Sequence, residues 1–156
     1  MTPSSSPALV AEAEVADAAA QLVAAFAGTR TQEYFAAFDA EATFVFHTED
    51  RRLESRADYE ALWNTWLAEG WSVTSCESTD VRIQLFGATA VFSHTVLTTA
   101  GTPEEQATTR ERETIVFTRS GGRIVAVHEH LSPLPDGTSS PEDLPVSVPS
   151  SAAADA

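Results

Sequence analysis

The sequence contains no lysine and a single cysteine, and these two shortages exclude several kinds of protein. Its positive charge comes from nine arginines, against 23 acidic residues, for a formal net charge of −14. Proteins that bind nucleic acid or an anionic membrane need a basic surface, which this composition does not supply. Cys76 alone can form neither an intrachain disulfide nor a cysteine-based zinc cluster. We therefore expect no nucleic-acid partner and no membrane partner.

Long hydrophobic runs are also missing. No stretch reaches the roughly 18 apolar residues that a membrane-spanning helix needs. Residues 1–9 have neither the basic residue nor the apolar run of a secretory signal. With 156 residues, 43% of them hydrophobic, the chain has the size and the apolar content of one globular domain. We expect a cytoplasmic protein.

The two ends of the chain differ in composition from the middle. Residues 133–156 are rich in proline, serine and alanine and contain four acidic residues, but no aromatic or basic residue. Such a segment buries too little apolar surface to offset the entropy of ordering it. The sequence predicts a flexible leader over residues 1–6, one domain over residues 7–132, and a disordered acidic tail over residues 133–156.

Three helices are predicted in the first half of the domain. Ser6 and Pro7 are typical of a helix start, and Gly28 is typical of its end. A short second helix follows Thr29, and a third begins at Ser55 and ends at Gly70. The third has the clearest helical periodicity, with its apolar residues at Tyr59, Leu62, Trp63, Trp66 and Leu67.

From residue 71 onward the apolar pattern changes to the period of two that is typical of strands. Strands are predicted at 42–47, 71–86, 88–99, 108–119 and 123–131, with a bulge or bend near residues 78–80. The connections between the last four strands are short, which makes them antiparallel. We expect an α+β fold, in which the helices cover one face of a curved antiparallel sheet.

The order of these elements and the residues near the end of the domain carry a family resemblance. The runs Glu113–Phe117 and Gly121–Ile124, followed by His128-Glu129-His130-Leu131-Ser132, resemble the close of SnoaL-like domains. The similarity covers about residues 10–132. It extends to the nuclear transport factor 2-like superfamily and to the association domain of calcium/calmodulin-dependent protein kinase II. The resemblance implies a cone-shaped fold, a homodimer formed through the sheet, and a pocket between the sheet and the helices.

The sequence departs from the kinase association domain at positions that matter for its ligand. Val96, Ile115 and Leu131 stand where that domain has pocket arginines, and Ile124 stands where the last strand usually has tryptophan. The arginine-based binding of carboxylates therefore does not carry over to this chain.

One fold of this kind supports many activities, so the resemblance implies no single reaction. We expect a homodimeric domain that binds a small organic molecule in an apolar pocket. Two alternatives remain open: an isomerase, cyclase or dehydratase that uses a pocket histidine or glutamate as acid or base, and an oligomerisation module without activity. We predict no metal and no cofactor.

His128 and His130 lie two residues apart on a predicted strand, so they share one face. With an odd number of loop residues in the last hairpin, Arg112 and Thr114 lie on that face, whereas an even number places Glu111 and Glu113 there. The odd-numbered apolar residues favour the first arrangement, because they form the more hydrophobic face. They are Ile115, Phe117, Val125, Val127 and Leu131. We therefore predict that Arg112, Thr114, His128 and His130 form the dimer face.

Glu129 then lies on the concave side of the sheet among apolar neighbours. Burial there would raise the pKa of its carboxyl and make it a candidate acid or base, unless Arg82 or Arg56 pairs with it. His94 is a second candidate, although a single buried histidine is more often structural. The catalytic candidates are His94, Glu129, His128 and His130. The predicted pocket consists of His47, Tyr59, Trp63, Trp66, His94, Ile115, Phe117, Glu129 and Leu131.

Overall fold

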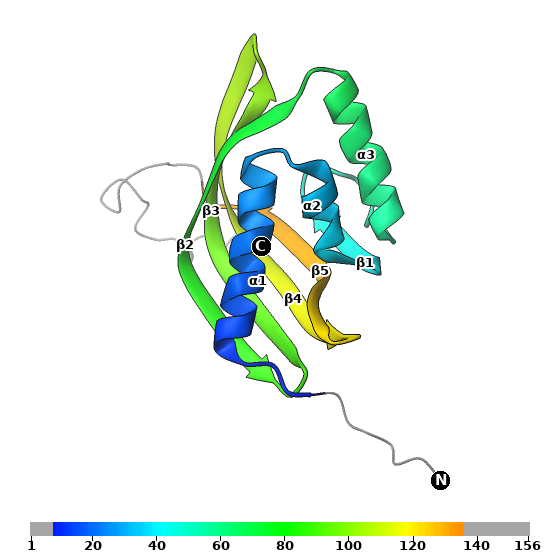
Figure 1. Cartoon of the computed structure of the whole chain (residues 1–156). Coiled ribbons are helices and arrows are strands. Elements are labelled where there is room, and N and C mark those ends of the chain that lie inside the picture. The colour runs from blue at the N-terminus through cyan, green and yellow to red at the C-terminus, as the bar shows by residue number, and fades with distance from the viewer. Residues whose placement is uncertain (1–7, 136–156) are drawn as a thin grey trace, which may run out of the picture.

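Three helices and five strands make up residues 8–135, the part of the chain that the computed structural model describes (Figure 1). The fold is α+β, as expected. In chain order, the elements are α1 (Glu12–Ala27), α2 (Thr31–Ala36), β1 (Phe38–Phe46), α3 (Arg56–Ala68), β2 (Ser72–Phe86), β3 (Thr89–Thr102), β4 (Glu105–Ser120) and β5 (Arg123–Pro133). None of these three helices has the length and apolarity required to cross a membrane.

The five strands form one sheet in the order β1-β5-β4-β3-β2. The strands β2 to β5 pair antiparallel with their neighbours, as their short connections predict. The strand β1 joins the edge of β5 in parallel, so the sheet is mixed and not purely antiparallel. This pairing places the first strand of the domain beside its last.

The helices lie on the concave side of the sheet (Figure 1). Alternate residues of β3 and β4 are buried against them, including Phe92, Ile115 and Phe117. The helix α3 adds Trp63, whose ring is fully buried and whose Nε1 donates a hydrogen bond of 2.9 Å to Oγ1 of Thr31. The core therefore extends from α3 through α2 to the concave face of the sheet.

The third helix begins where the sequence indicates. Oγ of Ser55 accepts a hydrogen bond of 3.1 Å from the backbone N–H of Asp58, which is an N-cap. Gly70 follows the helix with a φ of 92°, in the left-handed region that glycine adopts without strain.

The first helix begins later than the sequence predicts. Residues 8–11 are not helical, and α1 starts at Glu12; Ser6 and Pro7 lie outside the described residues. The guanidinium of Arg119 donates to the carbonyl oxygens of Ala8 and Leu9, and the N–H of Val10 donates to the carbonyl of Gly87. These bonds attach the segment before α1 to the sheet and compete with its helical hydrogen bonds.

The strand register shifts at several points in the sheet, and two of these shifts bear on the sequence predictions. In β2 the register shifts between Thr79 and Arg82, and Asp80 has a φ of 55°, which confirms the predicted bulge. In β5 the register shifts beside Val127, which is skipped in the pairing with β4 over residues 111–133. As a result, Val125 pairs with Thr118 on the outer face of the sheet. The prediction that Val125 lies on the concave face is wrong.

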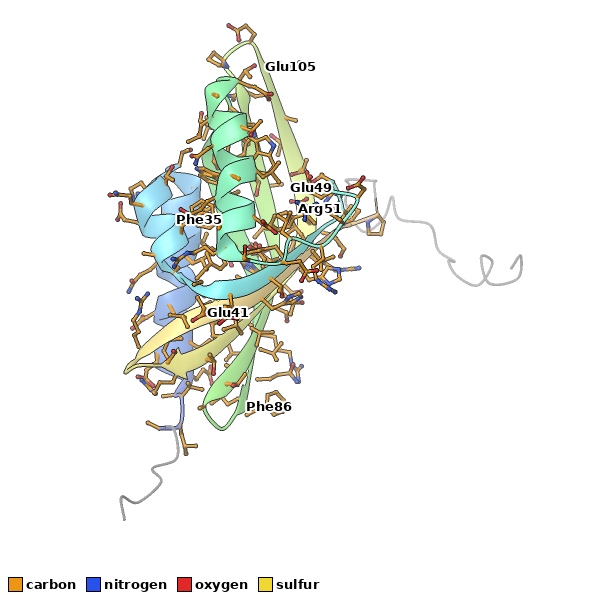
Figure 2. All side chains as sticks on the ribbon, turned by 90° about the vertical axis from the view of Figure 1, so that its right-hand side faces the viewer. Phe35, Glu41, Glu49, Arg51, Phe86 and Glu105 are labelled. Atoms are coloured by element: carbon orange, nitrogen blue, oxygen red, sulfur yellow. The ribbon has the colours of Figure 1, made fainter. Side chains whose placement is uncertain are left out.

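The ordered fold continues past residue 132. The strand β5 includes Pro133, and the N–H of Leu134 donates to the carbonyl of Arg110. The predicted leader 1–6 and the tail from residue 136 onward lie outside the described residues. Figure 2 shows the two far ends of the sheet, with Glu105 at the β3–β4 hairpin and Phe86 at the β2–β3 hairpin.

Candidate ligand-binding cavity

A cavity of about 430 Å³ lies between the helices and the concave face of the sheet. This volume is within the range of sites for small organic molecules. All three helices and all five strands, or the residues next to them, contribute to its lining. The lining residues are Leu22, Val23, Phe26, Tyr34, Phe46, His47, Thr48, Glu49, Tyr59, Trp66, Trp71, Cys76, Val96, Thr98, Ala100, Ala107, Thr109, Glu111, Glu113, Glu129 and Leu131.

One wall of the cavity is aromatic. The rings of Trp66 and Trp71 lie 5.1 Å apart, and the ring of Tyr59 lies 6.4 Å from that of Trp66. The hydroxyls of Tyr34 and Tyr59 share a hydrogen bond of 3.0 Å. Burial raises the pKa of both phenols well above the ordinary value, so both stay neutral and act as hydrogen-bonding groups.

Two buried carboxyls, Glu113 and Glu129, share the opposite side. Burial, together with the negative charge of Glu113, raises the pKa of Glu129 well above its ordinary value. The neighbouring carboxyl of Glu129 and the contact of Glu113 with His94 outweigh the effect of burial and lower the pKa of Glu113. The two pKa values therefore move apart, and Glu129 is the carboxyl that keeps a proton to higher pH.

Glu129 has an unused hydrogen-bonding atom. Its side chain is 3% exposed, and its Oε1 atom has no hydrogen-bond partner among the described residues. A buried acceptor without a donor costs free energy, so such atoms are uncommon in folded proteins. Because Glu129 lines the cavity, its carboxyl is a candidate contact for a ligand.

His94 connects this pair to the neighbouring strand. Its Nε2 lies 2.6 Å from Oε1 of Glu113, and its Nδ1 lies 2.6 Å from Oγ of Ser78. The imidazole is almost completely buried and does not line the cavity itself. From its position outside the lining, His94 therefore stabilises the negative charge of Glu113.

A second histidine and carboxylate pair lies at the exposed end of the cavity. Nε2 of His47 is 2.6 Å from Oε2 of Glu111, and the His47 side chain is 32% exposed. Thr48 and Glu49 complete this rim; Figure 2 shows Glu49 beside Arg51 in the loop after β1.

Cys76 also lines the cavity. Burial raises the pKa of its thiol to about 11, and nearby carboxylates act in the same direction. The thiol is therefore protonated at neutral pH and is a poor nucleophile.

The structure divides the predicted pocket residues into two groups. His47, Tyr59, Trp66, Glu129 and Leu131 line the cavity. The others are buried in the core around it: Trp63, His94, Ile115 and Phe117.

The residues predicted for the dimer face lie on the outer face of the sheet. Thr114 pairs with His130, and Arg112 pairs with Ser132. His128 is bound through Nδ1 to Oγ1 of Thr43 at 2.8 Å. His128 and His130 are therefore separated from the cavity by the sheet, whereas Glu129 lies inside it.

Neither arginine proposed as a partner of Glu129 pairs with it. Arg56 donates to the carbonyl of Phe38, and Arg82 lies opposite Ser93 in the β2–β3 register. The partner is another acid, Glu113. The sequence offered one signal for this pairing, because Glu113 and Glu129 alternate with apolar residues on adjacent strands, but the register that joins them depends on the bulge in β5.

A family model described as a SnoaL-like domain matches residues 15–136. No curated protein gives a significant match to the sequence.

Many solved structures share the fold at low sequence identity. An NTF2-like protein from Cytophaga hutchinsonii has a TM-score of 0.68 at 12% identity, covering 80% of this chain and 100% of its own. A putative Ca/calmodulin-dependent kinase II association domain from Exiguobacterium sibiricum has a TM-score of 0.68 at 12% identity, with coverages of 88% and 99%. An NTF2-like protein of unknown function from Pseudomonas putida has a TM-score of 0.66 at 17% identity, with coverages of 88% and 96%. These identities support the fold alone.

Proposed function

The chain belongs to the family of SnoaL-like domains, and from this premise we propose that it binds a small organic molecule in the cavity between its helices and its sheet. The observation that carries the proposal is the buried carboxyl of Glu129, which lines a cavity with an aromatic wall and whose Oε1 atom has no partner within residues 8–135. An apolar cavity with a few polar groups is typical of small-molecule sites. The aromatic wall would supply affinity, and the carboxyl pair would orient the ligand.

Filling the cavity tests this proposal. Ala107 lines it on β4 and is exposed, so Ala107→Trp adds a large side chain at the open side without disturbing buried packing. Thr108→Trp is the matched control, because successive strand residues point to opposite faces. Ligands found by native mass spectrometry of the wild-type chain against a compound library should bind Thr108→Trp normally and lose binding to Ala107→Trp. Equal binding to both variants would place the ligand elsewhere.

A second candidate function is proton transfer, favoured by the one proton that Glu113 and Glu129 share. Glu129 holds a proton that it can donate, and Glu113 holds a negative charge that can accept one. Two carboxyls whose pKa values move apart are a common arrangement of acid and base. His94 would stabilise Glu113 as a positioning residue.

The probe 5-nitrobenzisoxazole tests this chemistry without knowledge of the natural substrate. Glu113 would remove the ring C–H proton, the N–O bond would break, and the released phenolate oxygen would take the proton of Glu129. Glu113→Gln and Glu129→Gln should each lower the rate at least about 10-fold. Glu69→Gln, at the exposed end of α3, should match the wild type. Equal rates in all four proteins would reject catalysis by this pair.

We also propose that the protein is a homodimer formed through the outer face of the sheet. All helices among residues 8–135 lie on the other side (Figure 1), which leaves this face without a covering layer from that part of the chain. It carries Leu97, which is 37% exposed, among partly buried threonine and valine side chains.

A further inference from the structure

The charges of the cavity indicate which ligands it favours. Among the described residues, its lining contains four carboxyl side chains, from Glu49, Glu111, Glu113 and Glu129, but no arginine. The one imidazole that residues 8–135 place in the lining is that of His47, and it is already bound to Glu111. His94, behind the lining, is bound to Glu113. An anionic ligand would meet these negative groups, so the lining disfavours anions.

The hydrogen-bonding capacity of Glu129 indicates whether the ligand donates or accepts a hydrogen bond. Its Oε1 atom has no hydrogen-bond partner among the described residues, and once the carboxyl is ionised it can only accept a hydrogen bond. The group that satisfies Oε1 must therefore carry an N–H or O–H donor.

The aromatic wall adds a third preference. Six aromatic residues line the cavity: Phe26, Tyr34, Phe46, Tyr59, Trp66 and Trp71. The face of an aromatic ring carries negative electrostatic potential and attracts organic cations, tryptophan most strongly. Neutral ligands gain from the same rings only by apolar contact.

From the negative charge of the lining, the hydrogen-bonding capacity of Glu129 and the aromatic wall, we infer that the cavity binds an organic ammonium ion. Such a ligand carries a protonated amine group on an apolar body. This inference rests on the proposed binding function and names its ligand class. The ammonium N–H donates to the carboxyl of Glu129, and the apolar body lies against the aromatic wall. The ionised carboxylates of the lining repel anions, and neutral alcohols bind without the charge contribution.

Ammonium binding has a consequence for the shared proton. A cation beside Glu129 favours its ionised form, so the carboxyl loses its proton to solvent as the complex forms. The titratable groups that surround Glu129 from the packed elements are Tyr34 (α2), Tyr59 (α3), Cys76 (β2), His94 (β3), and Glu111 and Glu113 (β4). Both phenols and the thiol keep their protons at neutral pH. The released proton therefore comes from the hydrogen-bonded histidine and the carboxyls around Glu129.

Two matched series of probes test the inference on the full chain. They are 3-phenylpropylamine, 3-phenylpropanol and 3-phenylpropanoate, and tryptamine, tryptophol and indole-3-acetate. Titration calorimetry should show each amine binding at least about 10-fold more tightly than its alcohol, with the carboxylate weakest. Repeating the amine titration in two buffers of different ionisation enthalpy should reveal proton release, which the alcohols should not cause.

The Glu129→Gln variant tests the contribution of the negative charge, because it keeps the size of the side chain but cannot ionise. The introduced amide can keep a donor toward Glu113 and an acceptor toward the ligand, but it cannot ionise. The substitution should lower amine affinity about 10-fold and leave alcohol affinity unchanged, whereas Glu69→Gln should change neither.

The outcomes distinguish this inference from the proposed function. Alcohols or carboxylates that bind the wild type as tightly as the amines, and lose binding in Ala107→Trp, would overturn the ammonium assignment and leave a binding cavity. Failure of all six probes, together with a compound library that shows no difference between the wild type and Ala107→Trp, would overturn both.

Discussion

Glu129 is unusual because it is a buried acid whose nearest charged partner is another acid. A buried carboxylate is normally paired with a cation, and here no arginine within residues 8–135 forms such a pair with it. Burial and the neighbouring charge of Glu113 instead raise the pKa of Glu129, while the contact with His94 helps to lower the pKa of Glu113. Folding therefore favours the protonated form of Glu129, and stability must depend on pH.

Replacing Glu129 by glutamine should stabilise the protein at high pH. A carboxyl whose pKa is raised by folding gives its full stability below the unfolded value, here near 4.5, and loses it as the pH rises through the folded value. The amide of the substituted side chain cannot ionise, so the variant escapes this loss while it keeps a donor toward Glu113. Thermal unfolding should show a higher Tm for Glu129→Gln than for the wild type at about pH 8, with the difference narrowing toward about pH 5.

Glu69→Gln removes one negative charge from an exposed site and serves as the control. Its Tm should follow the wild type across the same pH range. A Tm difference for Glu129→Gln that is constant with pH, or that grows toward low pH, would contradict a protonated Glu129 in the folded state.

Among the elements, β5 shows where sequence reasoning succeeds and where it stops. The two-residue turn Gly121–Gly122 joins the pair formed by Ser120 and Arg123, and an even turn alone would place Glu113 on the face of the histidines. The bulge at Val127 restores the opposite arrangement, with Thr114 beside His130 and Glu129 in the cavity. The predicted faces of Glu129 and the histidines therefore match the structure. The argument from the number of loop residues did not include the bulge, which is what places these side chains on their faces.

The helices and the four antiparallel strands were predictable because each has a local signal. The cap at Ser55, the aromatic stripe of α3 and the short turns act over a few residues. The direction of β1 and the start of α1 depend on contacts between distant segments, such as the bonds of Arg119 to residues 8 and 9. No local pattern encodes such contacts, so the sequence could not settle them.

The candidate site was predictable in part for the same reason. The apolar alternation places Glu129 and the stripe of α3 on the concave side, but the stripe does not reveal that Trp66 reaches the cavity while Trp63 is fully buried. The carboxyl pair was missed because it joins residues on two strands through a register that one bulge determines.

For the whole molecule, the proposed dimer and the cavity lie on opposite faces of one sheet. The described residues of one chain already line a cavity of about 430 Å³. Assembly and ligand binding are then separable, and an oligomerisation module without ligand would need the dimer face alone.

Thr114→Glu should dissociate the dimer and leave ligand binding intact. Thr114 lies on the outer face between Ser93 of β3 and His130 of β5, so the change places a charge at the centre of the proposed interface in a chain that already carries −14. Sedimentation should show a dimer for the wild type and a monomer for Thr114→Glu. Gln106→Glu adds the same charge next to Glu105, at the tip of the hairpin (Figure 2), and should remain dimeric. A wild-type monomer, or a dimer that persists in Thr114→Glu, would reject the interface; a monomer that loses its ligand would show that the cavity depends on assembly after all.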